Sequence, residues 1–297
     1  MTLDLVLQLG PIRIARPGPQ EPEAGADAGG VAGGEPGADL VIAFASVGHD
    51  PARGPSPEFV ATALGRGRPA GAAPRRALFV MDDSRSWGNA PEFAPALRAA
   101  LADEAARAPL GRVAAIGQSM GGYAACAFSA ACPGADVVAI SPQSTLDKTI
   151  VPWETRYKVA WDRDFSGKYG DAAQASHAAR KVTILYDPYE PLDAGHVDRF
   201  TGSNVMKLRT PLMGHRLGSS LHQMGLLSPI LLAALDGSLT EADFHRLLRA
   251  RRDFPRYQRE LFQRAVAKGH KTLARRMGES VLKRNDNRAI RLGLHEL

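Results

Sequence analysis

The chain has 297 residues, of which 44% are hydrophobic and 23% are charged. These values are ordinary for a globular protein and leave room for one large α/β domain with a small appendage. The sequence has no run of roughly 18 apolar residues, so it predicts no membrane-spanning helix.

The first ten residues predict a strand and no secretory signal. They alternate in hydropathy, and no basic segment precedes the apolar positions. We therefore expect a strand over residues 3–15 and a cytoplasmic protein. The 2 cysteines, Cys126 and Cys132, are too few for a metal site of their own, and we expect both to be reduced.

Residues 17–38 consist almost entirely of Pro, Gly, Ala, Glu and Asp. This composition buries too little apolar area to offset the entropy of ordering, so it predicts a mobile loop. Strands are predicted at residues 39–46 and 77–81. The second strand leads into a polar loop that contains Trp87. Because ligands bind beyond the carboxyl ends of parallel strands, Trp87 is a candidate substrate contact; the alternative is an anchor for the loop.

The sequence Gly-Gln-Ser-Met-Gly at residues 117–121 is the strongest chemical signal in the chain. The apolar residues 112–116 predict a buried strand before it, and the small residues 122–131 predict a helix after it. A G-x-S-x-G sequence between a strand and a helix is typical of a nucleophile elbow, where a strained turn exposes the serine hydroxyl. Ser119 is therefore the candidate nucleophile, and the N–H of Met120 is a candidate oxyanion donor. A glycine-rich turn without chemistry is the alternative.

With this block the chain resembles the α/β-hydrolase superfamily of serine hydrolases, over about residues 39–235. The resemblance implies an α/β fold with a mostly parallel sheet, helices on both faces, and a catalytic triad in the order serine, acid, histidine. It also implies a second oxyanion amide after an early strand, which points to Val47, with Ser46 as the alternative. The family usually has His-Gly at this loop, whereas this chain has Ala-Ser. Gln118, beside the nucleophile, is a candidate substrate contact.

Residues 141–180 form an insertion after the predicted strand 136–140. Five aromatic residues recur at every fourth position: Trp153, Tyr157, Trp161, Phe165 and Tyr169. On a helix this spacing would place the first three of them on one face. Lids of related hydrolases are commonly inserted at this point. Trp153 and Trp161 are therefore candidate substrate contacts, and the alternative is that the aromatic residues attach the insertion to the body.

The β-branched residues 181–186 predict a buried strand that ends at Asp187. A carboxylate at that end of a parallel strand lies on the ligand-binding rim of the sheet, which makes Asp187 the candidate acid. Glu190 and Asp193 remain as alternatives.

His215 follows the predicted strand 204–209, and the resemblance implies that the base stands just past the last core strand. The other histidines that could serve by position are His49, His196 and His222. His222 falls within the next predicted helix, so His215 is favoured. The resulting order along the chain, serine then acid then histidine, agrees with the hydrolase arrangement.

Residues 236–297 differ in kind from the rest of the chain. Ser238 and Thr240 are credible caps for a helix that begins at residue 241, and helical patterns follow at 256–268 and 271–284. The last two patterns resemble a single tetratricopeptide-type unit, which is too short for a repeat array.

The C-terminal extension carries the basic excess of the protein. Residues 241–297 contain 15 Lys plus Arg and 7 Asp plus Glu, a net charge of +8, whereas the whole chain carries +6. A solvated face packed on the body, or a contact between copies of the chain, is the favoured interpretation. An anionic partner is the alternative, and we expect no specific nucleic-acid binding because no such motif is present.

The sequence thus predicts a hydrolase domain over residues 1–235 and a basic helical extension over 236–297. The predicted function is hydrolysis of a carboxylic ester or thioester on a small molecule or a polymer, without a metal or an organic cofactor. Acyl transfer uses the same residues and stays open. The alternative from another class is a catalytically idle body whose basic tail binds an anionic partner or polysaccharide.

Overall fold

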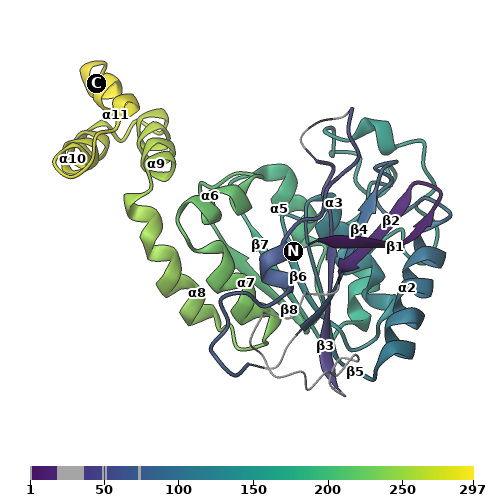
Figure 1. The fold of residues 1–297 in the computed structure, drawn as a ribbon. Coiled ribbons are helices and arrows are strands. Elements are labelled where there is room, and N and C mark those ends of the chain that lie inside the picture. Colours follow the sequence, from purple (N-terminus) through teal and green to yellow (C-terminus); the bar gives the residue numbers. More distant parts are fainter. Residues whose placement is uncertain (1, 19–36, 49, 51, 73–74) are drawn as a thin grey trace.

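A computed structural model describes residues 2–18, 37–48, 50, 52–72 and 75–297. Its centre is a sheet of eight strands in the order β1-β2-β4-β3-β5-β6-β7-β8 (Figure 1). The six strands β4, β3, β5, β6, β7 and β8 pair with one another in parallel, whereas β2 pairs antiparallel with both β1 and β4. This strand arrangement is that of the α/β-hydrolase fold, so the predicted fold class is confirmed.

The strands match the predicted apolar runs closely, with one exception at the N-terminus. Their bounds are β1 Leu3–Leu9, β2 Ile12–Pro17, β3 Ala38–Phe44, β4 Arg75–Asp82, β5 Leu110–Gln118, β6 Asp136–Ile140, β7 Lys181–Tyr186 and β8 Val205–Arg209.

The N-terminal segment is a hairpin, so the prediction of one strand over residues 3–15 is wrong. Leu9 pairs with Ile12 across a tight turn, and Gly10 in that turn has a φ of +53°. Glycine adopts this left-handed conformation without the steric cost that other residues meet. Most of the predicted mobile loop at 17–38 lies outside the described residues.

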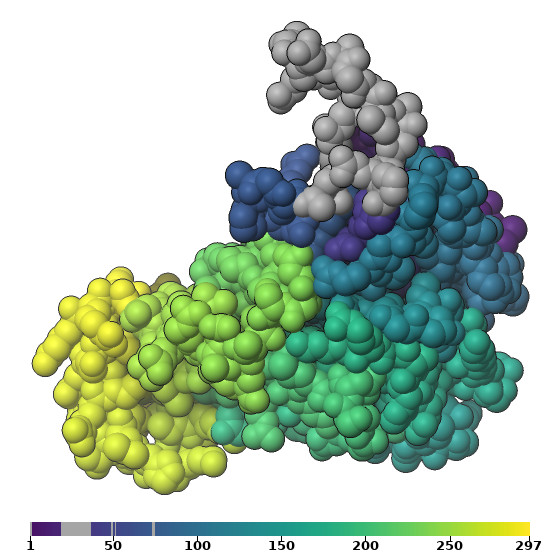
Figure 2. Space-filling model, turned by 90° about the horizontal axis from the view of Figure 1, so that it is seen from below, coloured from purple at the N-terminus to yellow at the C-terminus, as the bar shows by residue number. Residues whose placement is uncertain are grey.

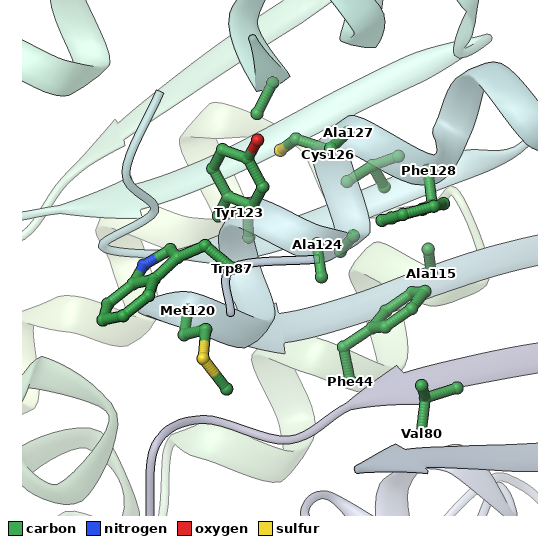
Figure 3. Packing of buried hydrophobic residues seen from close by; sticks show 14 of the residues in the cluster. Phe44, Val80, Trp87, Ala115, Met120, Tyr123, Ala124, Cys126, Ala127 and Phe128 are labelled. Carbon is green, nitrogen blue, oxygen red and sulfur yellow. The ribbon is translucent and has the colours of Figure 1, made fainter. Parts of the chain in front are cut away.

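Two apolar layers cover the two faces of the sheet. Leu40 and Phe44 of β3 belong to one layer, and Val41 and Ala43 between them belong to the other, because strand side chains alternate between faces. The first layer packs under α2 (Phe93–Arg107) and α3 (Met120–Ala127). Figure 3 shows this layer, with Phe44 beside Val80 and the α3 side chains above them.

The second face is covered by short helices that follow the last strand. They are α6 (Leu217–Gln223), α7 (Leu227–Leu235) and α8 (Glu241–Leu247). The short α1 (Val60–Ala63) also contacts the sheet, at β3 and β4. The single helix that the sequence predicted around His222 is divided into α6 and α7 by Gly225, which has a φ of +70°. Its N–H donates to the carbonyl of His222 at 2.9 Å, which ends α6.

The insertion at 141–180 is largely irregular, so the helix expected from its aromatic spacing is not formed. It contains only a 3₁₀ turn at Lys158–Ala160, the short α4 (Ala172–Ala175) and a second 3₁₀ turn at Ser176–Ala178. Helix α5 (Pro191–Asp198) follows β7. The aromatic residues of the insertion therefore do not share a helix face.

The C-terminal helices stand to one side of the sheet (Figures 1 and 2). After a 3₁₀ segment at Leu248–Asp253 come α9 (Pro255–Ala267), α10 (Lys271–Leu282) and α11 (Arg288–His295). These three helices share their own small core, which consists of Phe262, Ala274, Val281 and Ile290. The Thr240 side chain caps α8 as predicted, accepting from the N–H of Asp243 at 3.1 Å. In the described part of the chain, no helix has the length and apolar character that crossing a membrane requires.

Candidate active site

Ser119 stands on the turn between β5 and α3 with a φ of +52°, an uncommon conformation for a residue that is not glycine. The glycines around it are required by close backbone contacts. A β-carbon at Gly117 would lie 2.1 Å from the carbonyl oxygen of Gly121, and one at Gly121 would lie 2.2 Å from that of Phe44. The turn is thus tightly enclosed, and it holds the Ser119 side chain at the carboxyl end of the sheet.

His215 lies in the loop after β8 and reaches the serine. Its Nε2 is 3.0 Å from the Ser119 hydroxyl oxygen. Gly214, immediately before it, has a φ of +68°, so the loop bends back toward β5 as the sequence suggested. Of the rival histidines, His222 is exposed on α6 and His49 lies outside the described residues.

The carboxylate on His215 belongs to Asp193, in the first turn of α5. Its two oxygens lie 2.8 and 2.9 Å from His215 Nδ1, and the residue is completely buried. Burial alone would raise the pKa of Asp193, but hydrogen bonds from His215 and Arg156 outweigh it and hold the pKa below the usual value. The structure therefore assembles a Ser119–His215–Asp193 relay.

Asp187, the favoured acid from the sequence, is not brought to His215. One of its oxygens accepts the N–H of Gly214 at 2.7 Å, and the other accepts the N–H of Tyr189 at 2.9 Å. The Asp187 carboxylate therefore bridges the backbone of its own loop and that of the loop after β8, and it makes no hydrogen bond to the His215 ring. Asp187 fixes the loop that carries His215, and the alternative Asp193 takes the position expected of the acid.

Arg156, from the insertion, forms an ion pair with the buried acid. Its Nη1 donates to Asp193 at 2.7 Å, and its other nitrogens hold Glu154 at 2.6 to 3.1 Å. Burial alone would lower the pKa of Arg156, but its bonds to Glu154 and Asp193 raise it instead. Sequence reasoning missed Arg156, since it lies in an irregular segment and no local motif marks it.

His196 is a buried anchor and does not serve the nucleophile. Its Nδ1 accepts the N–H of Ser144 at 3.1 Å, so the proton resides on Nε2, which donates to Glu154 at 3.0 Å. Burial lowers the pKa of His196, and this effect outweighs the hydrogen bond and charge of Glu154, which would raise it. The ring is therefore neutral. Burial would raise the pKa of Glu154, but bonds from His196 and Arg156 lower it to about 2. This network ties the insertion to α5.

Two further polar side chains approach the Ser119 hydroxyl. The Tyr157 hydroxyl lies 3.5 Å from Ser119 Oγ and 3.3 Å from His215 Nε2, and Gln143 Nε2 lies 3.5 Å from Ser119 Oγ. Trp87 donates its indole N–H to Gln143 at 3.0 Å, and its ring lies 5.0 Å from that of Tyr157. Burial raises the pKa of Tyr157, so its hydroxyl keeps its proton.

The other candidate substrate contacts point elsewhere. The Gln118 side chain faces α6, since a β-carbon at Gly218 would lie 2.3 Å from its Oε1. Trp153 packs on the His196 ring at 4.7 Å, and Lys158 lies over the Trp161 ring at 5.6 Å. Trp87, by contrast, contacts Gln143 and Tyr157, both of which approach the Ser119 hydroxyl.

The identity of the oxyanion donors remains a prediction, and the contacts around Ser46, Val47 and Met120 reduce the number of candidate N–H groups. The N–H of Ser46 donates to Glu58 Oε1 at 3.2 Å, so the alternative donor is already engaged. Val47, beyond it, is held through its carbonyl by Arg85 at 2.8 Å. Met120 begins α3, where N–H groups have no helical partner. Among the described residues, no cluster of three or more His, Cys, Asp or Glu side chains could hold a metal ion.

Comparison with known proteins gives remote structural likenesses. No protein-family profile and no curated protein sequence matches the chain. Among solved structures, the capsule O-acetyltransferase of Neisseria meningitidis serogroup A matches with a TM-score of 0.49 and 11% identity, covering 75% of this chain and 93% of that chain. A Pyrobaculum calidifontis esterase matches at 0.47 and 16%, covering 77% of this chain and 81% of that chain.

A third similar structure is an α/β serine hydrolase without a lid from Xanthomonas campestris. Its TM-score is 0.47 and its identity 14%, with 80% of this chain and 94% of that chain covered. With TM-scores below 0.5, these likenesses decide nothing about the activity of this chain. Its fold rests on its own strand order and on the turn at Ser119.

Proposed function

We propose that this protein is a serine hydrolase that cleaves a carboxylic ester or thioester. The observation that carries the proposal is the continuous contact from Ser119 through His215 to Asp193, built on a strained turn. Nucleophilic catalysis requires a base within hydrogen-bond reach of the nucleophile and a third group that orients the base. This arrangement meets both requirements.

In the proposed reaction, Ser119 Oγ attacks the acyl carbonyl carbon while His215 Nε2 takes the hydroxyl proton. Asp193 holds the imidazole through Nδ1 and stabilises the imidazolium that forms. The N–H groups of Met120 and Val47 stabilise the oxyanion. His215 then protonates the leaving oxygen or sulfur, and water, activated by His215, cleaves the acyl-enzyme. Acyl transfer to another hydroxyl follows the same steps with that hydroxyl in place of water.

Tyr157 gives the proposed site a cover. Its hydroxyl lies within 3.5 Å of both Ser119 and His215, where a leaving group would stand during the reaction. Substrate must therefore displace this hydroxyl or accept a hydrogen bond from it. Tyr157→Ala removes the cover without touching the relay, which gives the test a variant with an opened site.

A fluorophosphonate probe, which reacts with activated serines, tests the proposal. We expect labelling of the wild type, none of Ser119→Ala, and labelling of His215→Ala slower by about 10³-fold or more. The Tyr157→Ala variant controls for a closed site. Labelling that survives in Ser119→Ala would contradict the proposal. So would an absence of labelling in both the folded wild type and Tyr157→Ala.

A further inference from the structure

A groove between the body and the C-terminal helices begins at the loop that carries His215. Its first part is a hollow of about 460 Å³, lined on one side by Asp187, Tyr189 and Gly214 and on the other by α9. Arg256 of α9 lines this hollow opposite Gly214. A β-carbon at Gly214, next to the catalytic histidine, would lie 3.1 Å from its Nη2. The first hollow thus opens at the rim of the candidate active site.

Arg256 also lines a second hollow, of about 670 Å³, between α6, α9 and the start of α11. Arg259 and Arg288 face the same space, and the acidic residue in its lining is Asp286. Asp286 is paired with Arg291, and Arg259 is paired with Glu260 at 2.9 Å. The second hollow is therefore positive, with its carboxylate already neutralised.

Two of the arginines in this hollow lack a partner in the described part of the chain. Neither Arg256 nor Arg288 makes a described hydrogen bond or ion pair, and Arg256 Nε is buried without an acceptor. Arg256 is only partly buried, and its guanidinium group and that of Arg288 line the hollow without a protein acceptor, so both are available to an acceptor supplied from outside. Arginine's planar fork binds phosphate through two parallel hydrogen bonds, which makes an oxyanion the acceptor that fits best.

The two hollows carry different charges, so the two ends of the groove fit different parts of a substrate. The first is lined by three carboxylates, of which Asp187 accepts two backbone N–H groups, Glu260 is paired with Arg259 at 2.9 Å, and Glu190 adds negative charge that disfavours an anion. Arg264 lies over the Tyr189 ring at 3.9 Å. An uncharged unit that carries the acyl group fits this part, beside His215. The positive charge lies further along, where Arg256 and Arg288 meet.

We infer that this groove binds the leaving-group side of the substrate, an alcohol chain whose first unit, beside His215, is uncharged and whose phosphate lies further along, in the second hollow. The inference rests on the proposed function, and it assigns Arg256 and Arg288 to phosphate binding. During acyl transfer to Ser119 the phosphates do not react; only the acyl–oxygen bond breaks, and His215 returns the proton to the leaving oxygen. The net charge of +8 over residues 241–297 would draw such a chain toward the groove.

Binding of inorganic pyrophosphate and of polyphosphate chains of increasing length, measured by calorimetry, tests the anion site without requiring activity. We expect affinity to fall about tenfold or more in Arg256→Gln/Arg288→Gln. The matched control is Arg275→Gln/Arg276→Gln, which removes the same charge from two exposed positions on α10. The single variant Arg288→Gln, at an exposed position, covers the case in which the double variant does not fold. Equal loss in both double variants would show a diffuse charge effect and overturn the inference.

Inhibition tests whether the anion site belongs to the substrate path. Polyphosphate long enough to extend from the second hollow past Arg256 to the opening of the first is expected to inhibit hydrolysis of a neutral aryl acetate competitively, because it obstructs entry beside His215, whereas pyrophosphate is not. Binding without competition at any length would refute a leaving-group subsite. If the protein shows no serine-dependent hydrolysis, the measurement is instead whether polyphosphate slows the labelling of Ser119 by the fluorophosphonate probe. If Ser119 is not labelled either, the proposed function fails, and the calorimetric result still decides the anion site.

Discussion

The choice between two carboxylates shows how local backbone bonding assigns roles to single residues. Asp187 and Asp193 follow the same strand and lie six residues apart in the sequence. Asp187 satisfies two backbone N–H groups, whereas Asp193 is buried against His215 and Arg156. A carboxylate that already accepts one backbone hydrogen bond from its own loop and one from the loop that carries His215 is poorly placed to orient an imidazole as well. The geometry therefore separates a structural aspartate from the proposed catalytic one.

Asparagine substitutions at both positions test this separation. Asp193→Asn should lower kcat for an ester by about 10³- to 10⁴-fold, because the amide favours the wrong imidazole tautomer. Asp187→Asn keeps one acceptor oxygen, so we expect less than about a tenfold change in kcat and a loss of about 1–3 kcal/mol of stability. Steady-state kinetics and urea unfolding measure the two effects. A larger kcat loss in Asp187→Asn than in Asp193→Asn would reverse the assignment.

The sequence predicted those site residues whose position is set by neighbouring residues. Ser119 is fixed by its two glycines and its flanking strand, and His215 follows the last strand directly. The choice of acid depends on how the turn between β7 and α5 folds, which no local pattern encodes. Tyr157 and Arg156 reach the site from an irregular insertion, so their positions follow from tertiary packing alone.

At the scale of elements, the strands could be predicted because β-branched and apolar runs mark buried parallel strands. The predicted boundaries of two elements were wrong because a single glycine interrupts each of them. Gly10 turns one expected strand into a hairpin, and Gly225 divides one expected helix into two. The aromatic spacing in the insertion indicated a helix, but these side chains pack individually. Phe165 meets Tyr123 edge-on at 6.4 Å, and Tyr169 stacks on Phe128 at 4.3 Å.

The contact between the insertion and α5 should depend on pH through His196. Burial lowers its pKa in the folded state below the unfolded value of about 6.5, so the unfolded chain binds more protons under mildly acidic conditions. This stabilisation is complete above that value and is lost as pH falls toward the folded pKa. Its slope is at most about 1.4 kcal/mol per pH unit.

Urea unfolding between pH 8 and pH 5 measures the effect. Glutamine cannot titrate, yet its amide can still donate to Glu154, so the matched variant is His196→Gln. We expect the wild type to lose stability with falling pH more steeply than this variant. Parallel pH profiles for the two proteins would exclude His196 as the titrating group. Glu154 has a pKa of about 2 in the folded protein, so its stabilisation is complete above the ordinary value of 4.5 and is lost only as pH falls from there toward 2.

At the scale of the whole molecule, the C-terminal extension divides into two parts by where its side chains are buried. Phe244 and Leu248 belong to the core beneath the sheet, together with the residues of α6 and α7. The helices α9 to α11 enclose a core of their own. The boundary predicted from composition, at residue 236, therefore precedes a helix that packs with the body. A boundary after Asp253, the last residue of the 3₁₀ segment, would instead separate the two cores.

Two truncations distinguish these parts. Ending the chain at residue 253 removes α9 to α11 and should leave the thermal unfolding of the body nearly unchanged, because the buried side chains removed pack mainly on one another. Ending it at residue 237 also removes Phe244 and Leu248, which should cost about 3–6 kcal/mol through lost burial. Differential scanning calorimetry of the three chains measures this. If the shorter deletion destabilised the body as much as the longer one, α9 to α11 would be integral to the hydrolase core, and their basic groove would have to be considered part of it.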